Sequence, residues 1–65
     1  MEYITITKDE NKYGFKKGDR FIVKRNIMNE CVVIIPDEHT PNVILSERQL
    51  RRYGTLEGTP QLCFH

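Results

Sequence analysis

The sequence predicts a small, mainly β domain in which four or five short strands are followed by one short helix over residues 46–53. Three observations predict this fold class. Apolar and polar residues alternate with a period of two over residues 2–8 and 20–25, as expected for strands with one buried face. Residues 31–35 form the most apolar run, and residues 45–54 carry the start and stop signals of a helix.

The 65 residues suffice for one small domain, which we place at residues 1–54, followed by a tail or last short strand at 55–65. The net charge is only +1, which argues against a protein held to nucleic acid by bulk charge. No apolar run reaches the roughly 20 residues of a membrane span, and the N-terminus lacks a secretory pattern. We therefore expect no membrane partner, and we expect Cys31 and Cys63 to be reduced thiols of a cytoplasmic protein.

The first two strands are predicted from their alternation. Residues 2–8 place Ile4 and Ile6 on one face and consist almost wholly of strand-forming residues. A polar loop follows, and the Gly-Asp pair at 18–19 marks the turn into a second strand over residues 20–25.

The third strand is predicted over residues 31–35, and residues 36–42 then form a loop that leads to a short return strand over residues 43–45. Four consecutive β-branched residues at 32–35 indicate a strand that is covered on both faces, as in a barrel or at an interface. Burying a Val or Ile side chain is worth roughly 1.5–3 kcal/mol, so either the helix and tail cover these residues or another chain does. We therefore expect a module that forms a homodimer or binds a partner.

The helix is predicted because its start signals are complete. Ser46 and Gln49 have the spacing of a capping box, and leucines on either side are placed for a hydrophobic staple. Gly54 would end the helix in the left-handed conformation.

The segment 15–23, in which basic residues and Gly-Asp precede an apolar alternation, resembles the entry to a barrel strand in small Src-homology-3-like β-barrel proteins. The late turn that contains Ser46, Leu50 and Tyr53 adds to this resemblance. It implies a small barrel of four or five short strands with one short helix. Members of that family that bind proline-rich ligands use an aromatic groove with a Trp, and this chain has no Trp.

The spacing of the Gly-Asp pair, Pro41 and the predicted helix is also similar to that of the carbon-storage-regulator family of RNA-binding proteins. We set that family aside because the first strand lacks its basic pattern and no small-residue turn precedes Pro41.

Two groups of basic residues are candidate binding sites. The helix would turn three arginines outward, either as a docking ridge for phosphates or an acidic protein surface, or as a solvated helix face; these are Arg48, Arg51 and Arg52. In the second group, the basic side chains of residues 8–20 are interleaved with Tyr13 and Phe15, which suits single-stranded nucleic acid unless these rings pack in the core. The candidate binding residues of this group are Tyr13, Lys16, Lys17 and Arg20.

Catalytic and metal-binding patterns find little support. Asp37, Glu38 and His39 share one loop, but no nucleophile oriented by a base and no phosphate-binding glycine loop accompanies them. The chain also lacks the two closely spaced ligand pairs of a structural zinc site. We expect no enzymatic activity, no metal and no cofactor.

The leading expectation is a small, cytoplasmic, non-enzymatic binding protein that acts by protein–protein interaction. Apolar strand residues would supply contact area, and the helix arginines would set orientation and association rate. Compact chains of this kind resemble accessory or inhibitor proteins of bacteria and their phages. The alternative is a nucleic-acid-binding module that uses the arginines and the basic loop at 12–20. A third alternative is capture of a small anionic ligand between subunits by the same arginines.

Overall fold

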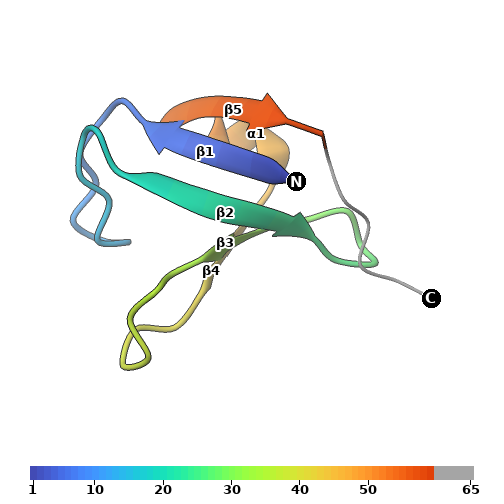
Figure 1. The fold of residues 1–65 in the computed structure, drawn as a ribbon, viewed down its shortest axis with the longest axis horizontal. Helices are drawn as coiled ribbons and strands as arrows, with labels where there is room; N and C mark the ends of the chain where they lie inside the picture. Colours follow the sequence, from blue (N-terminus) through green and yellow to red (C-terminus); the bar gives the residue numbers. More distant parts are fainter. Residues whose placement is uncertain (60–65) are drawn as a thin grey trace.

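Five antiparallel strands and one short helix make up the fold (Figure 1). The structure is a computed structural model, and it describes residues 1–59. The strands are β1 (Glu2–Ile6), β2 (Arg20–Arg25), β3 (Cys31–Ile34), β4 (Val43–Leu45) and β5 (Gly54–Gly58), and the helix is α1 (Glu47–Leu50). The prediction of a mainly β fold with one short helix is confirmed.

All five strands belong to one sheet with the order β4-β3-β2-β1-β5. The first four strands follow one another across the sheet, and β5 then returns to pair with β1, so the N-terminal strand lies in its interior. Glu2 is opposite Gly58 in this register, and Ile6 is opposite Gly54. Because β4 and β5 remain the two edges within residues 1–59, the described sheet does not close, and the predicted barrel is not confirmed.

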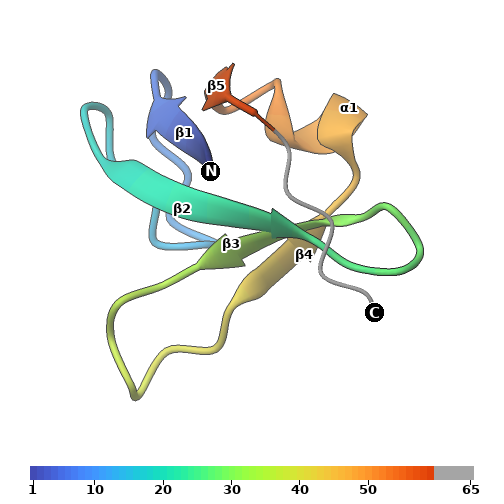
Figure 2. The same cartoon turned by 45° about the vertical axis from the view of Figure 1, so that its right-hand side comes forward.

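One face of the sheet carries the core. Figures 1 and 2 together show that α1 and the connection between β1 and β2 lie on the same side of the sheet. Burial alternates along β1 and β3, as expected for strands with one face on a core. The buried apolar residues are Ile4, Ile6, Phe15, Val23, Cys31, Val33, Leu45 and Leu50.

The helix begins as predicted and ends differently. The Ser46 hydroxyl accepts a hydrogen bond from the Gln49 amide, and the Gln49 side chain accepts one from the Ser46 amide, which completes the capping box. The α-helix then ends at Leu50 and passes into turns, so it is shorter than the predicted span of 46–53.

The role predicted for Gly54 is wrong. Gly54 is absent from the glycines with positive φ and is instead the first residue of β5. A Cβ atom at this position would collide with the backbone oxygen of Thr5 on the adjacent strand. Gly54 is therefore required by the close approach of β5 to β1, not by a left-handed helix end.

The segment predicted as a tail or last strand contributes β5 at its start, since Gly54–Gly58 pair with β1 along its whole length. The rest of the predicted tail lies outside the described residues, including Cys63, His65 and the apolar Leu62 and Phe64 with which it would cover residues 32–35.

Candidate protein-binding surface

The three arginines of the predicted ridge are all exposed, and they lie in α1 and the turn after it. α1 is oriented by Leu50, which is completely buried in the core. Arg51 does not present an unpaired charge, because its Nε atom donates to Glu47 Oε2 at 3.3 Å. Arg48 and Arg52 make no ion pair within residues 1–59.

Glu47 joins the helix to a charged pair inside the molecule that the sequence analysis did not single out. Arg25, at the end of β2, is only 4% exposed and donates two hydrogen bonds to the carboxylate of Glu2, with Nε to Oε1 at 3.0 Å and Nη2 to Oε2 at 2.9 Å. The same Nη2 atom lies 2.6 Å from Glu47 Oε1. These three residues tie β1, β2 and α1 together at one end of the sheet.

The ionisation of this cluster follows from its contacts. The hydrogen bond to Glu2 raises the pKa of Arg25 above its ordinary value, with a smaller contribution from Glu47. The hydrogen bond from Arg25 lowers the pKa of Glu47, and Arg51 contributes in the same direction. Burial raises the pKa of the neighbouring Cys31 thiol, so this cysteine is held in its neutral form. The cluster is fully paired and has a structural role.

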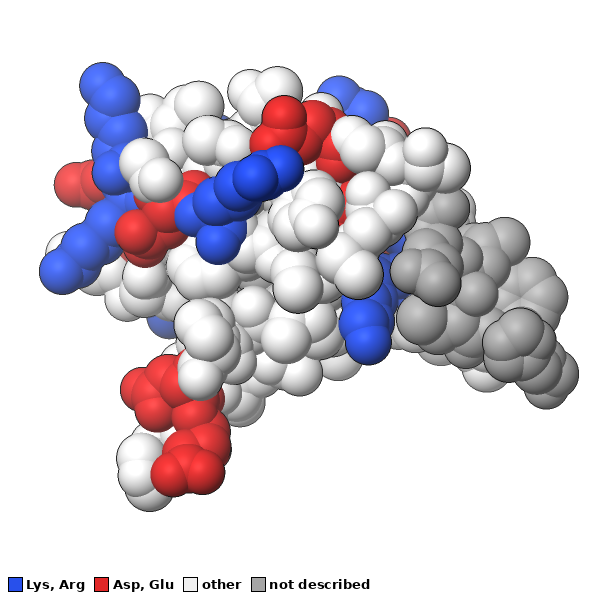
Figure 3. Space-filling view, viewed as in Figure 1, with Lys and Arg blue, Asp and Glu red and all other residues white. Residues whose placement is uncertain are grey.

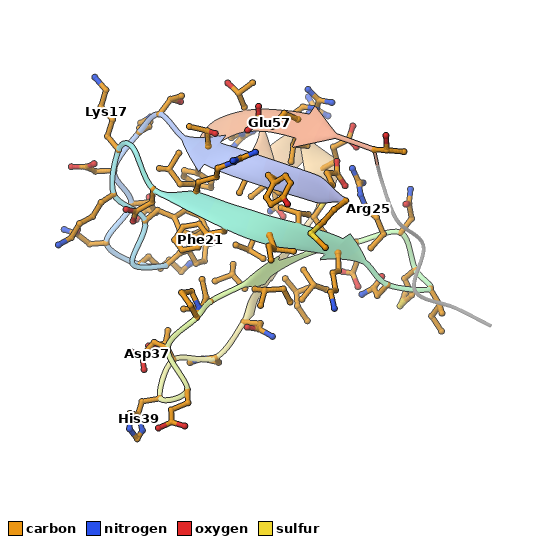
Figure 4. The ribbon with its side chains drawn as sticks, in the orientation of Figure 1. Lys17, Phe21, Arg25, Asp37, His39 and Glu57 are labelled. Carbon is orange, nitrogen blue, oxygen red and sulfur yellow. The ribbon has the colours of Figure 1, made fainter. Side chains whose placement is uncertain are left out.

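The basic loop uses its polar groups mainly to hold its own shape. The amide of Lys16 donates to Asp19 Oδ2 at 3.2 Å, and the amide of Lys17 donates to Asp9 Oδ1 at 2.7 Å. Both lysine side chains are exposed. Figure 4 shows Lys17 at one end of the sheet and Arg25 at the other, so the basic loop lies far from the cluster to which α1 is attached.

The two remaining residues of the second basic group are engaged elsewhere. Tyr13 is half-buried, and its ring packs against Phe15 at a centroid distance of 5.5 Å and against Tyr53 at 5.7 Å. Arg20 pairs with Glu57 at 3.1 Å and lies 4.2 Å above the ring of Tyr3. The structure therefore does not bring the seven candidate residues together into one surface.

The most distinctive surface is the side of the sheet opposite the core, which we call the open sheet face. Its residues alternate with the buried ones along each strand, and on a solvent-exposed face of an antiparallel sheet such residues are usually polar. Instead, five of its side chains are apolar or aromatic: Tyr3, Ile22, Val32, Ile34 and Ile44.

The register makes these five side chains neighbours. Tyr3 is opposite Ile22, and Ile22 is opposite Ile34, which gives one row across three strands. Val32 and Ile44 face each other in the next row. The first four are half-buried by their neighbours, whereas Ile44 is 56% exposed.

Charged residues lie around this apolar area. Lys24 ends the second row, because it is opposite Val32, and the Arg20–Glu57 ion pair flanks Tyr3. Figure 3 shows this face with a broad area free of charged side chains across its middle. An apolar centre with a polar rim is the usual anatomy of a protein–protein interface.

No family model, no curated protein and no solved structure matches this chain. The described residues contain no group of three or more His, Cys, Asp or Glu side chains placed to hold a metal ion. Within residues 1–59 no helix is long and apolar enough to cross a membrane.

Proposed function

We propose that this protein is a non-enzymatic binding protein that covers part of another protein's surface with its open sheet face. The observation that carries the proposal is the pair of adjacent apolar rows on the side of the sheet that neither α1 nor the β1–β2 connection covers. Burial of apolar surface is the dominant favourable contribution to protein association, and a few side chains near the centre of an interface, often Tyr among them, supply most of the binding energy.

The chemistry of this face favours a protein over a nucleic acid. Valine and isoleucine offer neither a hydrogen bond to a base edge nor an aromatic ring for stacking. The ring of Tyr3 could stack on a base, but Arg20 already lies over it. Arg20 and Arg51 are also paired with carboxylates, which reduces the charge available for phosphates. The Src-homology-3-like resemblance and the role as a bacterial or phage accessory protein stay predictions.

The experiment compares two lysine substitutions on the same side of the sheet. Ile34→Lys places a charge in the apolar centre, whereas Thr55→Lys places the same charge on β5, outside the two rows. Each tagged variant is used to capture partners from lysate of the source cells, with and without nuclease, at low and moderate salt. Urea unfolding checks that both variants are folded.

We expect the wild type and Thr55→Lys to recover the same protein, and Ile34→Lys to recover at least about tenfold less. Nuclease should leave recovery unchanged, and added salt should reduce it only slightly, because apolar contacts are weakly screened. Equal recovery by Ile34→Lys would overturn the proposal. Loss of recovery after nuclease treatment, or a steep loss with salt, would support the nucleic-acid alternative instead.

A further inference from the structure

β4 is an edge strand with a groove beside it. It pairs with β3 on one side and with no other strand of the described sheet, and Figure 2 shows it at the margin of the sheet. A groove of about 560 Å³ lies along this margin, between residues 11–14 of the β1–β2 connection and residues 40–45. Side chains and backbone from both segments line it.

The hydrogen bonds across the sheet show which backbone groups of β4 face this groove. In an antiparallel sheet, alternate residues of a strand bond to opposite neighbours. The amide of Thr59 donates to the carbonyl of Met1, so the odd-numbered residues of β1 bond to β5. The amide of Ile6 donates to the carbonyl of Asp19, so the even-numbered residues of β1 face β2.

The same alternation of hydrogen-bonding partners continues through β2 and β3 to the edge strand β4. The amide of Asn26 donates to the carbonyl of Glu30, which shows that even-numbered residues of β2 and β3 bond to each other. The odd-numbered residues of β3 therefore bond to β4, where their partners are Leu45 and Val43. It follows that the amide and carbonyl of Ile44 point away from β3. No residue within 1–59 bonds to them.

We propose that this groove binds an extended segment of a partner protein as a sixth strand that pairs with β4. The amide and carbonyl of Ile44 are unpaired, and they can form two hydrogen bonds with the central residue of an added strand. Because β4 has only three residues, the segment is short. Its alternate side chains would lie on the core side of the sheet, where the groove is lined by Tyr13 and Val43, so apolar residues fit at those positions.

The charged residue that lines the groove indicates which charge the bound segment should carry. Lys12 is the only charged residue among those that line it, and its ammonium group has no ion-pair partner among the described residues. Its Nζ atom lies 5.6 Å from the centre of the Tyr13 ring, which holds the charge at the groove. An acidic residue at one of the core-side positions of the bound segment, beside an apolar residue at the other, complements this charge. A second copy of the chain would bring its own Lys12 instead, and like charges disfavour that pairing.

The test uses two substitutions of one residue. Ile44→Pro removes the amide that points into the groove and leaves the bonds between β3 and β4 intact, which an edge strand tolerates. Ile44→Ala keeps the amide and removes the side chain, which belongs to the open sheet face. The probe is a blocked pentapeptide, Thr-Val-Thr-Glu-Thr, which pairs its central Thr with Ile44 and places Val and Glu together on the core side of the sheet, where Tyr13 and Lys12 lie. Its control is the same peptide with N-methyl groups on the three threonines, whose amides would face β4.

Binding is followed by amide NMR shifts of the ¹⁵N-labelled protein. We expect shifts at Ile44 and at residues 11–14, slower hydrogen exchange of the Ile44 amide, and no binding of the N-methylated peptide. Ile44→Pro should lower the affinity at least about tenfold, whereas Ile44→Ala should stay within about threefold of the wild type. Lys12→Gln should weaken binding of this peptide but not of one in which Gln replaces its Glu.

Equal binding of the N-methylated and unmodified peptides would overturn the proposal, even if Ile44→Pro proved to be unfolded. Absence of binding at millimolar peptide would also overturn it. Ile44 shifts that depend on protein concentration without peptide would assign this edge to a homodimer. Because Ile34→Lys leaves the edge intact, it should still bind the peptide, so the proposals for the edge and for the open sheet face fail separately.

Discussion

Arg25 lies at the centre of the buried charged cluster and contacts both of its carboxylates. Its guanidinium meets Glu2 from β1 and Glu47 from α1, and it is almost completely buried. The period of two does predict that Arg25 faces inward, because it follows Val23 by two residues. Its residue type argues against burial, and the partner on α1 is distant in sequence, so the local pattern could not predict the cluster.

Substitution of Arg25 tests the importance of this cluster. Arg25→Met should lower the free energy of unfolding by roughly 3–5 kcal/mol, because it leaves the buried Glu2 carboxylate without its partner. Adding Glu2→Leu should restore much of that loss, since the buried pair is then replaced by apolar groups. Urea unfolding measures both. Arg52→Met, at an exposed position, is the control and should change stability by less than about 0.5 kcal/mol. A loss for Arg25→Met no larger than this would contradict the prediction.

At the scale of elements, the strands that the sequence predicts well are those with an apolar alternation or a β-branched run, namely β1, β2 and β3. For residues 55–65 the sequence predicts a tail, with a last short strand only as the alternative, because the sequence of β5, Gly-Thr-Leu-Glu-Gly, has one large apolar residue between two glycines. It is a strand because β1 offers it a hydrogen-bonding edge, and that partner is about fifty residues away in the chain. The same dependence on long-range pairing explains why closure into a barrel could not be read from local patterns.

The junction of β5 with β1 can be tested at Gly54. Gly54→Ala should lower the free energy of unfolding by about 1–3 kcal/mol, because the added methyl group meets the Thr5 carbonyl and the Ile4 side chain. Thr55→Ala, at the next and exposed position, should cost much less. Thermal or urea unfolding distinguishes the two. A more stable Gly54→Ala protein would show instead that the loss of chain entropy on folding dominates at this position.

For the whole molecule, the decisive feature is that both the helix and the long connection cover the same side of one sheet. The β-branched run at 32–35 predicts a strand covered on both faces, and in the structure Val33 is buried in the core while Val32 and Ile34 are half-buried on the other face. It could not indicate which side would stay open, because that depends on where α1 and residues 7–19 pack. Of the seven site residues predicted from the sequence, Arg20 therefore lies at the rim of the open sheet face, whereas the other six lie on α1, the turn after it and the β1–β2 connection.

The stability of the whole fold should fall in acid. Glu47 has a lowered pKa in the folded state, chiefly because Arg25 donates a hydrogen bond to it, so the folded protein binds fewer protons than the unfolded chain. The stabilisation is present above the ordinary pKa of 4.5 and is lost as the pH falls through the folded-state value. Asp37, whose pKa is lowered by hydrogen bonds from His39 and Thr40, adds to the same trend.

Unfolding by urea at a series of pH values checks this expectation. Glu47→Gln should be less stable than the wild type at neutral pH, and its stability should fall less steeply below pH 4.5. Arg48→Gln, in the same helical turn, should keep the wild-type slope. Parallel curves for the wild type and Glu47→Gln would show that Glu47 does not carry this dependence.

The pairing of β5 with β1 also has a consequence for the order of events during synthesis. β1 is made first, but its second neighbour in the sheet is complete only when Gly58 has been added to the chain. Until then, β1 carries an unsatisfied row of amides and carbonyls beside the apolar residues Ile4 and Ile6. A nascent or prematurely terminated chain that ends before Gly54 therefore leaves one edge of β1 unpaired and prone to aggregation. We expect chaperones and proteases to recognise this strand before the others.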